Sequence, residues 1–161
     1  MTVGTLRSTG PAWSYKRGAT LGELTAFWGQ IAAMERKERV GASAWLAAVV
    51  HERVYQVFMC GRLAGMCFVA DLPDRREMAF TKTEWLVSKH PVAFARAIPG
   101  LLRDLARLER GRDGKPMYMH VPEGDDRSAA WFVRAGCRLT AGGLRCPVAR
   151  KKGARRRRRR R

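Results

Sequence analysis

Residues 125–137 read DDRSAAWFVRAGC, and this stretch decides most about the fold. Either aspartate at its start can open a helix, because a short side-chain oxygen accepts the free N–H groups of a first helical turn. Gly136 can end that helix, since glycine adopts the backbone of a helix C-terminus at little cost. From Cys137 to Val148 apolar residues alternate around a pair of glycines, which is typical of a hairpin. The stretch therefore predicts a helix through Val133, followed by the last strands.

A long helix is expected upstream, from Pro91 to Gly111. Pro99 and Gly100 lie inside it, so the helix should be kinked there or begin again. A short strand, residues 117–121, follows it. The helix has an apolar stripe formed by Val92, Phe94, Ala95, Ile98, Leu101, Leu102, Leu105 and Leu108.

The middle of the chain has the alternation of β-strands. Residues 54–60, 63–72 and 78–88 are each rich in β-branched, aromatic and sulfur-containing side chains, and turn residues separate them. They predict three consecutive antiparallel strands, the first two joined by a tight hairpin.

Two helices are expected before these strands. Thr20 and Glu23 have the spacing of a capping box and predict a helix over residues 20–38. Ser43 can cap a second helix, which continues from residue 44 to residue 53. Residues 1–19 contain three glycines and a proline and predict an irregular lead-in with one short strand.

This order of elements resembles the GNAT fold of N-acetyltransferases. Residues 125–137 are similar to that family's N-P-x-A-x-x-L-Y-x-x-x-G-F segment, with Asp125 for the asparagine, Ser128 for the alanine and Phe132 for the tyrosine. The resemblance implies an α/β (α+β) fold, in which helices cover both faces of a mixed, mostly antiparallel sheet. The expected domain spans residues 1–149, and residues 150–161 form a disordered basic tail.

The resemblance also implies where acetyl-CoA would bind. The family uses its fourth strand and the following turn, where a glycine-rich loop offers N–H groups to the pyrophosphate. Here no glycine occurs between Gly65 and Gly100, and Pro91 removes one donor. Phe132 stands where the family often has a tyrosine, and it has no proton to give to a leaving thiolate. The candidate cofactor-binding residues are Trp85, Leu86, Val87, Ser88 and Phe132.

Two titratable residues are candidates for a general base. Glu84 would lie on the fourth strand of the family's sheet and His120 on the fifth, where those two strands diverge. The alternative for each is an ordinary strand residue that faces solvent or is satisfied inside the fold.

A narrower resemblance concerns residues 80–85 and 131–136, together with the arginine-rich helix between them. This combination of segments is similar to that in GNAT-like proteins of short-tailed bacteriophages, the internal virion protein A family. It implies a non-catalytic structural or accessory protein without a cofactor, which contacts other virion proteins. Its expected location is the phage virion, or the host cytoplasm during assembly. The alternative function is an acetyl-CoA-dependent N-acetyltransferase.

Charge points to a polyanionic partner. The 161-residue chain has a formal net charge of +18, of which ten positive charges lie in residues 150–161, leaving +8 on the rest. Such a segment binds phosphates without reading base sequence, so the expected partner is nucleic acid, in the first place DNA. The candidate nucleic-acid contacts are Arg150, Lys151, Lys152, Arg155, Arg156, Arg157, Arg158, Arg159, Arg160 and Arg161.

The four cysteines lie in apolar contexts and form no C-x-x-C pair. This pattern predicts reduced, buried thiols rather than disulfides or a metal site. No apolar run approaches the roughly 18 residues that span a bilayer, so no membrane span is expected. The cysteines are Cys60, Cys67, Cys137 and Cys146.

Overall fold

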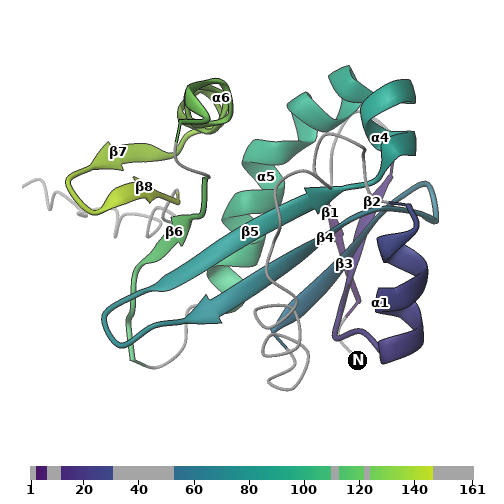
Figure 1. The fold of residues 1–161 in the computed structure, drawn as a ribbon, viewed down its shortest axis with the longest axis horizontal. Coiled ribbons are helices and arrows are strands. Elements are labelled where there is room, and N and C mark those ends of the chain that lie inside the picture. Colours follow the sequence, from purple (N-terminus) through teal and green to yellow (C-terminus); the bar gives the residue numbers. More distant parts are fainter. Residues whose placement is uncertain (1–2, 7–11, 31–52, 110–112, 122–123, 147–161) are drawn as a thin grey trace, which may run out of the picture.

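The computed structural model describes residues 3–6, 12–30, 53–109, 113–121 and 124–146, and its strands form one sheet (Figure 1). The strands are β1 (Val3–Leu6), β2 (Trp13–Arg17), β3 (Val54–Met59), β4 (Arg62–Asp71), β5 (Arg76–Lys82), β6 (Met117–Met119), β7 (Arg138–Thr140) and β8 (Gly143–Arg145). The helices are α1 (Leu21–Trp28), α4 (Glu84–Lys89), α5 (Pro91–Glu109) and α6 (Asp126–Arg134).

The sheet is mixed and mostly antiparallel, with the strand order β1-β2-β3-β4-β5-β6-β8-β7. Among the described strands, β5 and β6 alone pair in parallel, through Arg76 with Met117, Glu77 with Tyr118 and Met78 with Met119. β5 then continues to Lys82, while β6 ends and the chain leads to α6 (Figure 1). The two strands therefore diverge after Met78.

Helices cover both faces of the sheet, as expected. The larger core lies under α5 and α6, where Ile98, Leu101, Leu102 and Leu105 are almost completely buried against the strands. A smaller core lies under α1 and consists of Leu24, Phe27, Val54, Met66 and Phe68. Burying apolar side chains on each face stabilises the sheet between two helical layers.

The N-terminal region differs from the expectation in two ways. The lead-in contains two strands rather than one, because β1 and β2 pair along their length. The capping box is confirmed, since the Thr20 hydroxyl accepts from the Glu23 N–H and the Glu23 carboxylate accepts from the Thr20 N–H. However, α1 ends at Trp28 rather than at residue 38. Gly29 forms its C-cap. The second expected helix, residues 44–53, lies outside the described part except for its last residue.

The third expected strand is shorter than predicted, because residues 84–89 form helix α4. Thr83 starts this helix: its hydroxyl oxygen accepts from the Leu86 N–H at 3.3 Å and donates to the Ala64 carbonyl at 2.9 Å. A threonine tied to the neighbouring strand thus ends β5 and caps α4 with one side chain.

The expected interruption of the long helix is wrong in one respect. α5 is a single helix that continues through Pro99 and Gly100. It does not begin again, because the burial of its leucines on the sheet compensates for the hydrogen bond that proline cannot make. The expected β3–β4 hairpin, β6, α6 and the final β7–β8 hairpin are confirmed.

Gly65 on β4 provides a test of the packing beside β5. A Cβ atom there would lie 2.5 Å from the Thr81 carbonyl oxygen and 2.8 Å from Cζ of Phe80. We expect Gly65→Ala to lower the free energy of unfolding by about 1–3 kcal/mol, because strand or ring must move. Gly100→Ala is the matched control: a Cβ there meets no atom within 4 Å, and alanine favours the helix by about 1 kcal/mol. Denaturant unfolding of both variants measures the difference. Equal stability of the two variants would contradict this account of Gly65.

Candidate active site at the diverging strands

The divergence of β5 from β6 leaves one edge of β5 open. The Arg76 N–H donates to the Pro116 carbonyl and the Met78 carbonyl accepts from the His120 N–H, so residues 76 and 78 direct their backbone groups toward β6. Backbone direction alternates along a strand, and Phe80 therefore directs its N–H and C=O to the same side. No described strand pairs with β5 at that point. An extended ligand with amide groups can hydrogen-bond there as a strand would.

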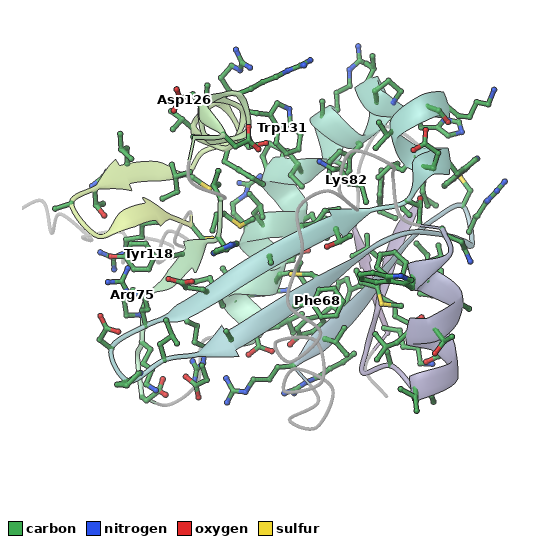
Figure 2. The ribbon with its side chains drawn as sticks, viewed as in Figure 1. Phe68, Arg75, Lys82, Tyr118, Asp126 and Trp131 are labelled. Atoms are coloured by element: carbon green, nitrogen blue, oxygen red, sulfur yellow. The ribbon has the colours of Figure 1, made fainter. Side chains whose placement is uncertain are left out.

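An aromatic stack lies on the α5 side of this divergence. The Phe94 ring of α5 is stacked on Phe80 of β5 and on Trp131 of α6, with 5.3 Å between ring centroids in each case. Phe132 packs edge-on against Trp131, with 5.1 Å between centroids. In Figure 2 Trp131 lies between α6 and α5. The stack joins β5, α5 and α6, so it fixes α6 relative to the open strand edge.

His120 lies at the point where β5 and β6 diverge. Its backbone N–H makes the bond to the Met78 carbonyl described above, at 2.8 Å. Its imidazole is more than half exposed, and Nδ1 lies 3.7 Å from the Glu77 carboxylate. Because Met78 and Phe80 face α5, alternation places Glu77 on the opposite face of the sheet. A histidine that lies beside a carboxylate and is open to water is a suitable proton acceptor.

Glu84 is not placed as the sequence predicted. It lies in the first turn of α4 rather than on a strand, and it is exposed. The expectation assumed that β5 continued through residue 84, but the Thr83 cap ends the strand first. Glu84 is therefore removed from the edge of β5 that Phe80 presents.

Four of the five candidate cofactor-binding residues also belong to helix α4. Trp85, Leu86, Val87 and Ser88 lie in α4, so they offer no open strand edge. Leu86 is fully buried, and Trp85 packs edge-on against His90 with the Arg62 guanidinium 4.6 Å from its ring. The fifth expected residue, Phe132, is buried in the main core.

The start of α4 offers few donors to a phosphate. The Glu84 N–H donates to the Gln30 carbonyl at 2.8 Å, the Leu86 N–H to the Thr83 hydroxyl and the Val87 N–H to the Thr83 carbonyl. The Glu84 carboxylate adds a negative charge at this turn. A pyrophosphate is therefore not favoured at the start of α4, in agreement with the missing glycine-rich loop.

The paired ends of β5 and β6 are held by a charge network. The Arg76 guanidinium, 5% exposed, donates to the Glu109 carbonyl at 2.7 Å and to Asp113 at 2.8 Å. The Tyr55 hydroxyl donates to the buried Glu109 carboxylate, and burial together with this carboxylate raises the pKa of Tyr55. Asp71 lies between Arg53, at 3.2 Å, and Lys115, at 3.0 Å.

A second set of contacts, made by Arg75, joins the β4–β5 turn to the β7–β8 hairpin and to β6. Arg75 donates to the Gly142 carbonyl at 2.5 Å, and its guanidinium lies 4.7 Å from the Tyr118 ring (Figure 2). Together with the network around Arg76, it fixes one end of the β5–β6 pair while the other end stays apart.

Solved structures support this description of the fold. An acetyltransferase from Agrobacterium tumefaciens has a TM-score of 0.57 at 14% identity, over 87% of this chain and 86% of that one. A GNAT family acetyltransferase from Listeria monocytogenes has a TM-score of 0.53 at 11% identity, over 89% and 97%. This chain has the GNAT acetyltransferase fold. Neither a family model nor a curated protein sequence matches it.

A third structure with the GNAT fold contains a ligand. It comes from Arabidopsis thaliana, in complex with the bisubstrate analogue CoA-Ac-MVNAL, and has a TM-score of 0.50 at 11% identity over 80% of this chain and 84% of that one.

Several residues of the candidate site were not identified from sequence. Nothing in the sequence distinguishes four of them from ordinary core or strand residues: Phe80, Phe94, Trp131 and Glu77. The spacing of the aromatic residues gives no sign that they meet, because they come from three elements. His120 was identified from sequence as a candidate general base, and the structure places it where β5 and β6 diverge.

The expectation that the four cysteines are buried is confirmed for three of them. Cys67, Cys137 and Cys146 are buried, but Cys60 is exposed in the β3–β4 turn. No group of three metal-ligating side chains occurs within the described residues, and no helix there is long and apolar enough to cross a membrane. The candidate nucleic-acid contacts, residues 150–161, lie outside the described part.

Proposed function

We propose that this protein is an acetyl-CoA-dependent N-acetyltransferase. The observation that supports it most directly is the open edge of β5 at Phe80, next to His120, in a fold shared with acetyltransferases. An acyl donor with a pantetheine arm can add to this edge through its amides. His120 lies within one residue of the point where the strands part.

The chain's own residues would divide the work as follows. Backbone groups of Phe80 orient the donor arm, and the Phe80–Phe94–Trp131 stack excludes water on the α5 side. His120 accepts the proton of the attacking amine through Nε2, while Glu77 holds the ring. A new N–C bond replaces the C–S bond of the thioester. Since Phe132 cannot donate a proton, the released thiolate takes its proton from water.

A direct assay tests this proposal. The protein is incubated with acetyl-CoA and a panel of peptides with free N-terminal or lysine amines. Free thiol release is followed by a colour reagent, and acetylated products by mass spectrometry. Thiol release that requires both the amine and the folded protein supports the proposal. Release at the rate of a heat-denatured control on all amines would contradict it.

A second candidate is the non-catalytic protein of a phage particle. The specific observation in its favour is the start of α4, where the N–H groups of Glu84, Leu86 and Val87 already have partners. Under this proposal the fold is retained as a scaffold for contacts with other virion proteins. Acetyl-CoA binding separates the two proposals, because a scaffold has no reason to bind it.

Nucleic-acid contact through the basic tail is compatible with either function. A chain truncated after residue 149 loses ten of its positive charges. If up to seven phosphates of duplex DNA are neutralised by Arg155–Arg161, the log–log slope of affinity against salt should be near −6, and truncation should remove most of this slope. Binding titrations at several salt concentrations measure both slopes. Identical slopes for the two chains would show that the tail does not contact the DNA.

A further inference from the structure

Cys137 and Cys146 occupy opposite positions at the base of the last hairpin. β7 and β8 pair through Arg138 with Arg145, Leu139 with Leu144 and Thr140 with Gly143. Extending this register by one position places Cys137 opposite Cys146. Both side chains are buried, with 4% exposure each.

The backbone identifies the kind of pair that the two residues form. The Cys137 N–H donates to the Phe132 carbonyl, and the Cys146 N–H donates to the Met117 carbonyl. Neither residue bonds to the other, so the pair has the non-hydrogen-bonded geometry of an antiparallel ladder. In such pairs the Cα atoms lie about 4.5 Å apart. Disulfides need a Cα separation of roughly 4.4–6.8 Å, so this geometry is compatible with one.

The two thiols also interact. They lie within hydrogen-bonding reach, and the bond from the Cys146 thiol to the Cys137 sulfur lowers the pKa of Cys137. The same bond, together with burial, raises the pKa of Cys146. The two sulfurs are thus close enough to share a proton, as a nucleophilic cysteine with a neighbouring second thiol requires.

We propose that Cys137 and Cys146 form a redox-active dithiol, which hydroperoxides convert to a disulfide that closes the base of the β7–β8 hairpin. The disulfide would connect the C-terminal end of α6 to the end of β8. α6 carries Trp131, so the bond would also hold the aromatic stack in place.

The chemistry balances with hydrogen peroxide as the oxidant. The Cys137 thiol gives up its proton, and the thiolate attacks one peroxide oxygen. The O–O bond breaks, a sulfenic acid forms, and the leaving hydroxide takes up a proton to become water. The Cys146 sulfur then attacks the sulfenic sulfur, the S–S bond forms, and a second water leaves. Two thiols lose two electrons and two protons, and peroxide gains both.

The test is alkylation counting on the full chain. After stoichiometric peroxide, the protein is denatured without reductant and treated with iodoacetamide. Of four cysteines, two should react, Cys60 and Cys67, and a 137–146 cross-linked peptide should appear in the digest. Reduction before alkylation should restore four labels. Four labels without reduction, or a cross-link involving Cys60 or Cys67, would overturn the proposal.

Two variants make the test specific. Cys67→Ala removes the other buried thiol of the same core and should leave the cross-link unchanged. Cys146→Ser should stop the reaction at the sulfenic acid of Cys137, which dimedone traps as a stable adduct. A Cys146→Ser protein without that adduct would also contradict the assigned nucleophile. If either variant folds poorly, the count of alkylated cysteines in the unmodified chain still decides the test.

Discussion

Under the proposed function, replacing His120 with alanine should lower the rate of acetyl transfer by about 100- to 10,000-fold while leaving the fold intact. This range is the usual contribution of a general base. The imidazole is more than half exposed, so its removal creates no cavity. The backbone bond from residue 120 to the Met78 carbonyl remains available in the variant. The measurement is kcat with saturating acetyl-CoA and amine.

Two matched variants make this prediction specific. Glu77→Gln keeps the shape of the side chain beside His120 and should lower kcat less than His120→Ala, because it only loosens the ring. Glu84→Gln changes an exposed carboxyl in α4 and should leave kcat unchanged. A His120→Ala protein that retains wild-type kcat would show that the proton goes elsewhere.

Replacing Arg76 with alanine should lower the free energy of unfolding by about 3 kcal/mol, the lower end for breaking a buried ion pair. The substitution removes the guanidinium donor from the Glu109 carbonyl and from the Asp113 carboxylate, which then keeps only the Lys115 N–H among these donors. The lower end applies because water reaches Asp71 and Asp113, which are about one-third exposed or more. Denaturant unfolding measures the loss.

Arg75→Ala is the control for this prediction. The neighbouring arginine makes one carbonyl bond, a cation–π contact with Tyr118 and an ion pair with the exposed Asp74, and it is a quarter exposed. Its loss should cost about 1 kcal/mol or less. Equal destabilisation by the two substitutions would contradict the role assigned to the buried network.

The same network gives stability a definite dependence on pH. Lys115, together with Arg53 and Arg76, holds the pKa of Asp71 below its usual value, and the Lys115 backbone N–H with Arg76 does so for Asp113. Carboxylates with lowered pKa stabilise the fold above their unfolded pKa, and this stabilisation is lost as pH falls through the folded pKa. The acid limb of the stability profile should therefore be shallower in Arg76→Ala.

Much of the fold could be predicted because its signals are local. The Asp125 carboxylate caps α6 by accepting from the Ser128 N–H. This cap, Gly136 and the alternation after Cys137 each lie within a few residues of the structure they determine. α4 was missed because the Thr83 hydroxyl that caps it also bonds to the Ala64 carbonyl of β4, a contact that short-range patterns do not contain. For Pro99, burial of the leucine stripe outweighed a local helix-breaking signal.

The candidate site was predicted less well than the fold. Its open edge depends on where β6 stops pairing with β5, which is a property of the sheet rather than of either segment. The stack joins Phe80, Phe94 and Trp131 from three elements, and no sequence spacing relates them. His120 was found because a histidine directly after a short strand is chemically conspicuous wherever it lies.

The most direct test of the proposed function is the stability of the protein with acetyl-CoA. A ligand that binds the native state alone stabilises it by mass action, by about 2.7 kcal/mol at 100 times its Kd. We predict a clear rise in Tm at millimolar acetyl-CoA. S-acetylpantetheine should give much of the same rise, since the fit lies on the β5 edge and not at the start of α4. No change in Tm with either thioester would contradict the proposal that this fold binds an acyl donor.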